Sequence, residues 1–409
     1  MPKLVLAYSG GLDTTTAIKW LSVERGYEVV ALNIDVGKSR EQPVIESRGM
    51  AAGAASVRVI DAKEDFLRYF AFPALAAGAI YQDAYPLATA LARPLMAKLL
   101  VDVAHEEGAA AVAHGCTGKG NDQVRFDVGV QTLDPSLQIV APTREYAMAR
   151  EAQIEYLQQH GVDIPWGAKG PFSIDENIWG RSAEAGVLED PWVEPPPDAY
   201  EWTRDPDRTG EPVYVEIAFE AGMPVALDGE NLPALELVER LNQLGGEHGV
   251  GRIDQIEDRL VGIKSREIYE APAAVILHTA HAALENMTLS KQQLRLKKQV
   301  ATEYAELIYN GLWFSAHHRD IAAYIASTQR HVTGTIRMKL GHGRATVVGR
   351  KAPDSLYDHA LATYDRGDSF DQAASVGFIS IWGLQTRVQA RKQLLGDLPE
   401  ALKIATTQE

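Results

Sequence analysis

The sequence predicts an α/β fold: a doubly wound parallel sheet in residues 1–165, an α+β region in residues 166–363 and a helix in residues 364–409. Three observations lead to this prediction. Apolar runs alternate with helical patterns in the first part, Pro and Gly interrupt that alternation, and an amphipathic pattern returns near the end. The length of 409 residues also fits two or three domains of about 150 residues each.

Five short runs in the first part predict strands that are buried on both faces. Each run is apolar at nearly every position, whereas a strand with one face in solvent would alternate. The runs are Leu4–Tyr8, Val29–Ile34, Val57–Ile60, Ala110–His114 and Gln138–Ala141.

Helical patterns fill most of the segments between these runs. They cover Thr14–Arg25, Asp65–Ala77, Arg93–Glu107 and Glu145–His160. In a doubly wound sheet, ligands bind beyond the carboxyl ends of the strands. Functional residues are therefore expected directly after the first, second, fourth and fifth runs.

The second part is predicted to mix hairpins with helices. Pro165, Gly167, Gly170 and Pro171 indicate its beginning. One hairpin joins Val213–Phe219 to Pro224–Asp228, another joins Thr335–Leu340 to Ala345–Val348, and helices cover Leu232–Leu244 and Pro272–Glu285.

Apolar residues at helical spacing predict an amphipathic helix near the end of the chain. This pattern favours packing on a partner subunit and on its own domain about equally. The residues are Ala374, Phe378, Ile381, Leu384, Val388 and Leu395.

The composition excludes several classes of protein. There are 55 acidic and 40 basic residues, a formal net charge of −15, which disfavours nucleic acid and anionic membranes as partners. No apolar run reaches the roughly 18 residues of a membrane span, and the first residues lack the apolar stretch of a secretory signal. Cys116 is the only cysteine, which excludes an intramolecular disulfide framework. We therefore expect a cytoplasmic protein.

The segment YSGGLDT, residues 8–14, joins the first strand to the first helix. Its two glycines allow a tight turn, and the amides at a helix start attract phosphate oxygens. Ser9 and Thr14 add hydroxyl donors. The segment fits neither a P-loop nor a Rossmann loop. A plain strand-to-helix turn with Asp13 or Thr14 as the N-cap is a compatible alternative.

The segment HGCTGKGNDQVRF, residues 114–126, follows the fourth strand and can therefore face the first loop. Arg125 suits a carboxylate and Asp122 an ammonium group, as in the recognition of an amino acid. A solvated glycine-rich turn would explain Gly118 and Gly120 but not so many polar groups. Cys116 is interpreted as a packing residue.

The first loop is similar to the SGGxD[ST] loop of the N-type ATP pyrophosphatases. Longer segments resemble the argininosuccinate synthase family. The resemblance implies a nucleotide-binding domain, a synthetase domain and a C-terminal helix that contributes to a homotetramer. The segments are AYSGGLDT from residue 7, YPLATALARPL from 85, HGCTGKGNDQVRF from 114, GVLEDPW from 186, IEDRLVGIKSREIYEAP from 256 and VGRKAPDSLY from 348.

The resemblance also implies roles for individual residues. It implies ATP binding by Ala7, Tyr8, Ser9, Gly10, Gly11, Leu12, Asp13, Thr14, Thr15, Ile34 and Gly115. It implies citrulline binding by Tyr85, Asn121, Arg125, Ser173, Ser182, Glu257 and Tyr269, and aspartate binding by Thr117, Asn121 and Asp122. Asp122, Asn121 and Asp13 are the expected catalytic residues.

The implied reaction joins citrulline to aspartate through a citrullyl-adenylate, with AMP and pyrophosphate released and Mg²⁺ on the ATP. No metal site made by the protein alone is expected. Arginine biosynthesis and the urea cycle are both open as its context. The alternatives are another ligase of the ATP pyrophosphatase type, similar to an NAD or GMP synthetase, and a non-catalytic nucleotide-sensing module.

Overall fold

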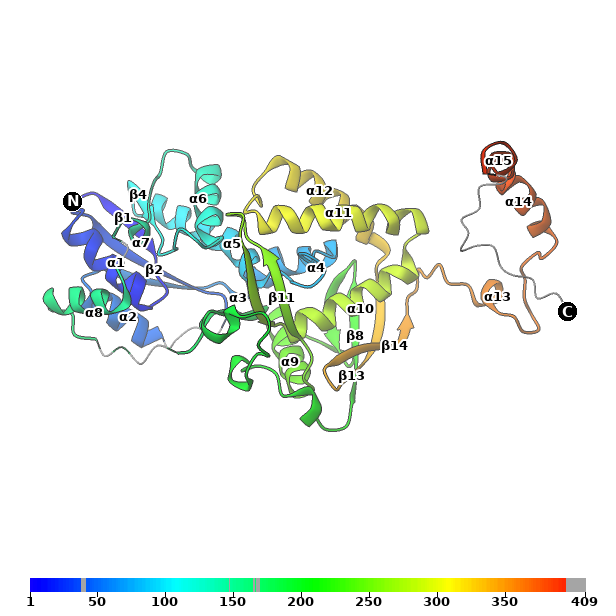
Figure 1. Ribbon diagram of the computed structural model, residues 1–409, viewed down its shortest axis with the longest axis horizontal. Helices are drawn as coiled ribbons and strands as arrows, with labels where there is room; N and C mark the ends of the chain where they lie inside the picture. Colours follow the sequence, from blue (N-terminus) through cyan, green and yellow to red (C-terminus); the bar gives the residue numbers. More distant parts are fainter. Residues whose placement is uncertain (38–41, 147, 165, 167–169, 395–409) are drawn as a thin grey trace. The chain divides into compact units, whose positions relative to one another are not determined.

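The computed structural model describes residues 1–409 except 38–41, 147, 165, 167–169 and 395–409 (Figure 1). It consists of two compact units, Met1–Leu356 and Tyr357–Glu409, which are treated separately below. Pro165 and Gly167 of the predicted boundary, and Leu395 of the predicted terminal helix, lie outside the described residues. The boundary near residue 165 therefore remains a prediction.

A five-stranded sheet forms the first part of unit 1. Its strands are β1 (Lys3–Ala7), β2 (Glu28–Asp35), β3 (Ser56–Asp61), β4 (Ala111–Ala113) and β5 (Gln138–Val140). All neighbours are parallel and the order is β3-β2-β1-β4-β5, which confirms the predicted doubly wound sheet. The chain leaves β1 toward β2 and later returns on its other side as β4, so the switch point lies between β1 and β4.

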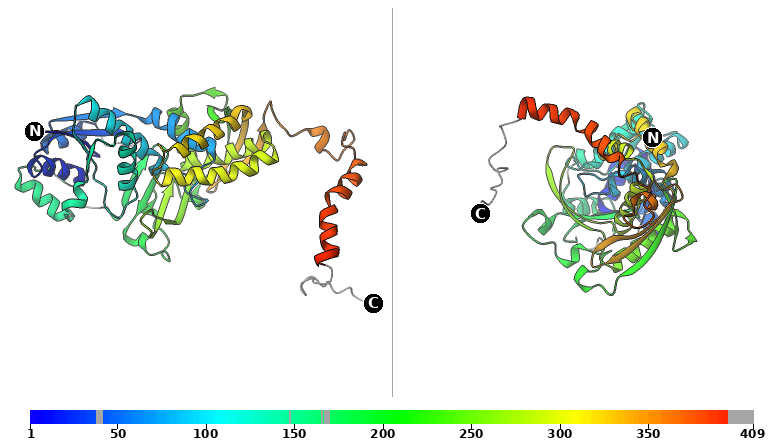
Figure 2. Two further views of the ribbon diagram at one scale, coloured as in Figure 1. Left: turned by 90° about the horizontal axis from the view of Figure 1, so that it is seen from above. Right: turned by 90° about the vertical axis from the view of Figure 1, so that its right-hand side faces the viewer.

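Helices cover both faces of this sheet (Figure 2). On one face, α1 (Leu12–Val23) and α2 (Gln42–Ala51) pack on Leu4 and Leu6. On the other face, α5 (Ala88–Glu106) and α6 (Asp122–Leu133) pack on Val5. This arrangement explains why β1 is apolar at consecutive positions. The connections are completed by α3 (Lys63–Phe66), η1 (Leu67–Ala71), α4 (Phe72–Ala77), α7 (Pro142–Tyr146) and α8 (Arg150–Gln159).

Two further sheets complete the strands of unit 1. One has the order β10-β9-β8-β13-β14 and contains both predicted hairpins. The other, β11-β12-β7-β6, has no counterpart in the prediction. The strands are β6 (Ser173–Asn177), β7 (Gly180–Glu184), β8 (Val213–Glu220), β9 (Met223–Leu227), β10 (Glu230–Asn231), β11 (Arg252–Asp258), β12 (Lys264–Glu270), β13 (Gly334–Gly341) and β14 (Arg344–Lys351).

Four long helices accompany these sheets: α9 (Ala234–Glu247), α10 (Pro272–Thr288), α11 (Lys291–Tyr309) and α12 (Ala316–Thr328). Figure 1 shows α11 and α12 side by side. The largest apolar core continues from Phe66 and Leu75 to Ile276, Leu277 and Ile336. The α/β part and the α+β part of unit 1 therefore share buried surface. Short 3-10 turns lie at Gly186–Glu189, Pro197–Ala199, Pro206–Arg208 and Gln329–His331.

Unit 2 contains α13 (His359–Ala362), α14 (Ala374–Trp382), α15 (Leu384–Gln389) and η6 (Ala390–Leu394). The predicted helical pattern is present in α14 and α15, which are separated by Gly383. Apolar side chains of this pattern are exposed, including Phe378 at 60% and Ile381 at 77%. Among the helices of the described residues, none is long and apolar enough to cross a bilayer.

Candidate functional site

A cavity of about 340 Å³ opens at the carboxyl ends of β1, β2 and β4. This is the switch point of the sheet, where a ligand site was expected. Most of the predicted ATP-binding residues line the cavity: Ala7, Tyr8, Ser9, Gly11, Asp13, Thr14, Ile34 and Gly115. Arg93, Cys116, Asp175 and Glu176 also contribute to its wall.

The loop after β1 leaves the start of α1 without a side-chain cap. The helix begins at Leu12 with Gly11 as its N-cap residue, which has no side chain to cap the first-turn amides. The alternative that Asp13 or Thr14 is the N-cap is therefore wrong, because both lie inside the first turn. Thr14 Oγ1 instead lies 3.1 Å from Ser9 Oγ. The amides of the first turn remain available to an anion, together with the helix dipole.

Three of the predicted ATP residues shape this loop but do not line the cavity. Gly10 has a φ of 71°, a conformation that suits glycine. Leu12 packs with Leu157 below the loop. The hydroxyl of Thr15 donates to the carbonyl oxygen of Gly11 at 2.7 Å.

The loop after β4 touches the first loop at Gly115. A Cβ atom at this position would lie 2.8 Å from Thr14 Cγ2, so the close approach requires glycine. The next residue, Cys116, packs against the core beneath the sheet, and burial raises the pKa of its thiol. A protonated thiol agrees with the interpretation of Cys116 as a packing residue.

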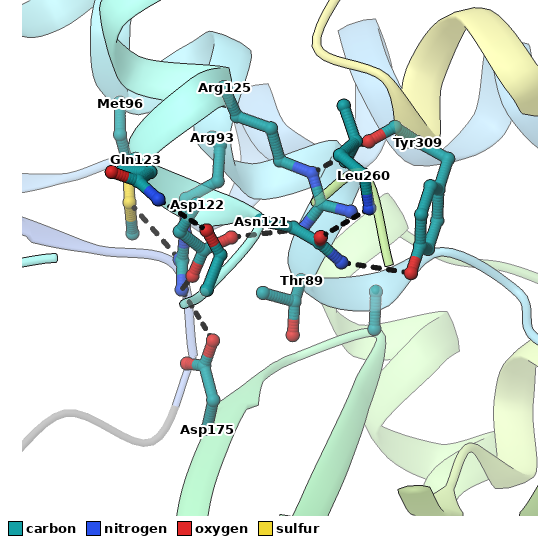
Figure 3. Close-up of polar contacts among 12 residues, drawn as sticks. Thr89, Arg93, Met96, Asn121, Asp122, Gln123, Arg125, Asp175, Leu260 and Tyr309 are labelled. Carbon is teal, nitrogen blue, oxygen red and sulfur yellow. Dashed lines mark hydrogen bonds and ion pairs between the residues drawn. The ribbon is translucent and has the colours of Figure 1, made fainter. Parts of the chain in front are cut away.

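Asp122, at the start of α6, joins two arginines (Figure 3). Arg93 Nη2 donates to Asp122 Oδ2 at 2.7 Å and also pairs with Asp175. Arg125 Nη1 donates to Asp122 Oδ1 at 2.9 Å. Burial alone would raise the pKa of Asp122, but the charges of Arg93 and Arg125 lower it. Asp122 therefore stays ionised and links the cavity wall at Arg93 to the buried Arg125.

Arg125 belongs to a second group of residues, which we call the tyrosine–carboxylate cluster: Tyr85, Asn121, Arg125, Glu257, Tyr269 and Tyr309. At its centre lies Glu257 of β11, which is only 3% exposed. Tyr269 of β12 donates to Glu257 Oε2 at 2.7 Å and stacks on Tyr85 with ring centroids 4.1 Å apart. The cluster thus brings together most of the residues expected to bind citrulline.

Asn121 connects the cluster to two other elements. Its amide nitrogen donates to the phenol oxygen of Tyr309 at 2.8 Å. Its amide oxygen accepts from the backbone N–H of Leu260 at 2.9 Å, in the turn between β11 and β12. The side chain is therefore held at both ends.

The remaining predicted residues lie nearer the surface. Ser182 of β7 is opposite Tyr269 of β12 in the sheet, and its hydroxyl donates to the carbonyl oxygen of Asp175 at 3.3 Å. Ser173 and Thr117 are exposed. Ser182 therefore adjoins the cluster, whereas Ser173 and Thr117 face solvent.

Asp175 and Tyr309 are site residues that the sequence did not predict, and Arg93 was given no binding or catalytic role. Arg93 lies within the segment that resembles the family near residue 85, so that resemblance could have identified it. Asp175 and Tyr309 carry no local signal, because long-range packing alone brings them to Arg93 and Asn121.

Family models match most of this chain. A family model described as the arginosuccinate synthase N-terminal HUP domain matches residues 3–163, and one described as the arginosuccinate synthase C-terminal domain matches residues 172–389. A solved structure titled a predicted subunit of a tRNA methyltransferase from Methanocaldococcus jannaschii covers 39% of this chain and 75% of its own. Its identity of 13% and TM-score of 0.27 are too low to bear on the fold.

Curated relatives match over nearly the whole chain. The argininosuccinate synthase of Dehalococcoides mccartyi is 56% identical over 392 residues, covering 96% of this chain and 97% of its own. That of Listeria monocytogenes is 53% identical over 389 residues, covering 95% and 96%. That of Oceanobacillus iheyensis is 51% identical over 389 residues, covering 95% and 93%. The chain therefore belongs to the argininosuccinate synthase family of ATP-dependent ligases that form C–N bonds.

Proposed function

We propose that this protein converts ATP, L-citrulline and L-aspartate to argininosuccinate, AMP and pyrophosphate in arginine metabolism. One observation carries the proposal beyond family membership. Arg93 of the cavity wall and Arg125 of the tyrosine–carboxylate cluster both pair with Asp122. A nucleotide in the cavity and an amino acid at the cluster would therefore lie on either side of one carboxylate.

The cavity is proposed to hold ATP. The uncapped start of α1 and the hydroxyls of Ser9 and Thr14 supply donors for the phosphates. Ile34, at the end of β2, supplies an apolar contact for the base. Gly115 keeps the opposite wall free of a side chain.

Citrulline is proposed to bind at the cluster. Arg125 Nη2 is buried and has no hydrogen-bond partner among the described residues, so it can donate to the α-carboxylate. Glu257 can accept from the ammonium group or orient the ureido end. Tyr85, Tyr269 and Ser182 complete this side, with Ser173 closing the site from the exposed edge of β6.

Aspartate is proposed to bind at Thr117, Asn121 and Asp122. The lowered pKa of Asp122 makes it a weak base. Its proposed role is therefore to hold and orient the aspartate amine, with Asn121 helping to place the ligand.

Mg²⁺ is proposed to arrive with ATP. The described residues include no group of three or more His, Cys, Asp or Glu side chains that could hold a metal ion. Magnesium usually binds through phosphate oxygens, water and one or two carboxylates, and Asp13 is the carboxylate in the phosphate loop that lines the cavity. When bound, the ion would neutralise charge on the leaving pyrophosphate.

The chemistry needs no covalent bond to the protein. The ureido oxygen of citrulline attacks the α-phosphorus of ATP, and the bond to pyrophosphate breaks. The aspartate amine then attacks the activated ureido carbon, loses a proton and expels AMP. The residues described above act by positioning the reactants and stabilising charge.

The test is to measure AMP and pyrophosphate with each substrate left out in turn. We expect sustained release of both only when citrulline and aspartate are present together, with argininosuccinate formed in equal amount. Turnover with ammonia and a nucleotide acceptor would instead support another ATP-pyrophosphatase ligase. ATP binding without turnover would support the sensing module.

A homotetramer in the cytoplasm is also proposed. The exposed apolar side chains of α14 and α15 support self-association. Light scattering should give about four chain masses for the wild type and a smaller mass for Ile381→Glu. An unchanged mass in the variant would remove this support.

The single cysteine of the chain agrees with the reducing compartment proposed for the protein, the cytoplasm.

A further inference from the structure

Tyr309, the last residue of α11, contacts three members of the cluster, and Figure 3 shows two of them, Asn121 and Arg125. Its phenol donates to Glu257 Oε1 at 2.6 Å and accepts from Asn121 Nδ2 at 2.8 Å. Its backbone carbonyl accepts from Arg125 Nε at 3.0 Å. One residue therefore connects three side chains that are expected to bind citrulline.

The position of Tyr309 is fixed on several sides. The side chain is 1% exposed, and its ring stacks on Tyr81 with centroids 3.6 Å apart. The Arg125 guanidinium lies 4.9 Å from the ring centroid. Gly311 has a φ of 75° and lies close to the Arg125 backbone. A Cβ atom at this position would lie 2.9 Å from Arg125 Cα. The phenol is thus held rigidly beside Glu257.

We infer that Tyr309 is a positioning residue for citrulline: it orients the carboxylate of Glu257 and the amide of Asn121 without touching the substrate itself. This inference rests on the proposed function of the cluster. A carboxylate that accepts from two phenols, those of Tyr269 and Tyr309, is restrained in its plane. The remaining acceptor directions of Glu257 are then fixed before the substrate arrives.

A purely structural tyrosine would act through its ring, whereas a positioning tyrosine acts through its hydroxyl. Removing the hydroxyl alone keeps the stack on Tyr81 but leaves Glu257 Oε1 and Asn121 Nδ2 without their bonds to it. Both atoms belong to residues of the cluster. The cost should therefore appear mainly in citrulline binding and less in thermal stability.

The experiment compares Tyr309→Phe with Tyr304→Phe in the full chain. Tyr304 is also buried on α11, but its ring packs on Trp313 and His318. For Tyr309→Phe we expect the KM for citrulline to rise roughly ten- to hundredfold, the range for loss of a hydrogen bond to a charged group. The KM for ATP should stay within about twofold of wild type, and Tyr304→Phe should change neither value.

The pH profile gives a readout that a structural role would not change. Burial raises the pKa of Glu257 above its ordinary value. Hydrogen bonds from Tyr309 and Tyr269 and the charges of Arg125 and Arg259 offset part of this rise. Burial, together with the neighbouring carboxylates Glu184 and Glu257, raises the pKa of the nearby Glu267 to about 8, so Glu267 adds little negative charge at neutral pH. Without the Tyr309 hydroxyl, the pKa of Glu257 should rise further. The acid limb of kcat/KM for citrulline should then move to higher pH in Tyr309→Phe and stay in place in Tyr304→Phe.

A double variant separates loss of the hydroxyl's bond to Glu257 from any general effect of Tyr309→Phe on the fold. In Glu257→Gln the charge is gone, so adding Tyr309→Phe should change the KM for citrulline far less than it does in wild type. The inference would be overturned if Tyr309→Phe raised the KM for citrulline as much in Glu257→Gln as in wild type. A KM for citrulline in Tyr309→Phe within twofold of that in Tyr304→Phe would also overturn it. Failure of the proposed function differs, because wild type itself would then show no citrulline-dependent AMP release.

Discussion

Gly115 illustrates how one missing side chain determines the space for a ligand. Its α-carbon faces Thr14 across the mouth of the cavity, and a Cβ atom would lie 2.8 Å from the Thr14 methyl group. The same loop contains Gly118, where a Cβ atom would meet nothing within 4 Å. Two glycines that look alike in the sequence therefore have different tolerance for alanine.

We predict that Gly115→Ala raises the KM for ATP roughly tenfold, because the new methyl group overpacks the contact between the two loops. Gly118→Ala is the control and should leave that KM unchanged. Steady-state kinetics with ATP varied at saturating citrulline and aspartate make the comparison. Equal values for both variants would contradict the assignment of the cavity to ATP.

Asp122 provides a prediction about pH. Its ion pairs with Arg93 and Arg125 lower its pKa in the folded state. The free energy that these ion pairs add to folding is fully present above the ordinary pKa of Asp. It is lost as the pH falls through the lowered pKa of Asp122 in the folded state. Asp122→Asn should lower the free energy of unfolding by about 1.5–3 kcal/mol at pH 7. Chemical denaturation should show this difference narrowing in acid; a difference independent of pH would refute it.

At the scale of elements, β12 and its neighbours depend on Glu270. This carboxylate is fully buried and accepts from Arg181 Nη1 at 3.0 Å and from Thr203 Oγ1 at 2.7 Å. The backbone amides of residues 201–203 also donate to it. One side chain of β12 thus holds both β7 and the loop that ends at Thr203.

We predict that Glu270→Gln destabilises unit 1 by about 3–5 kcal/mol, because it leaves the buried charge of Arg181 with only the exposed Glu201, 3.6 Å away, as its ionic partner. Glu230→Gln removes the same charge from an exposed pair with Arg240 and should cost less than about 1 kcal/mol. Urea titration of both variants tests this difference. Similar midpoints would show that Glu270 is not the main attachment of the loop.

The sequence could predict β1 to β5 because buried parallel strands are continuously apolar. It could not predict β11 and β12, whose many charged residues make them look like surface chain. Glu257 and Glu267 on these strands are in fact buried among phenols and Arg259. The same reason explains Tyr309, whose partner Asn121 lies 188 positions away in the chain. Local patterns cannot report partners at such separations.

At the scale of the whole molecule, the net charge of −15 coexists with an anionic substrate. At the site, Arg125 is buried, Arg93 is partly buried, and both pair with Asp122. Lys119, in the loop after β4, is exposed. Binding of ATP therefore depends on local donors and not on the overall field.

We predict that the protein binds ATP but not long polyanions. Because the overall charge repels nucleic acid, labelled single- and double-stranded DNA should show no mobility shift at about 50 mM salt, even at micromolar protein. ATP should bind under the same conditions in equilibrium dialysis. A mobility shift that weakens with added salt would reveal a basic surface and contradict the prediction.

The wide spacing of the cluster along the chain has a consequence for synthesis on the ribosome. The lining of the nucleotide cavity is complete once Glu176 has been translated, whereas the cluster also needs Glu257, Tyr269 and finally Tyr309. N-terminal parts of a chain generally fold first during synthesis. A nascent chain can therefore form the walls of the proposed ATP site well before it can form those of the proposed citrulline site. During synthesis the growing polypeptide would therefore pass through a stage that has the proposed ATP site but lacks the proposed citrulline site.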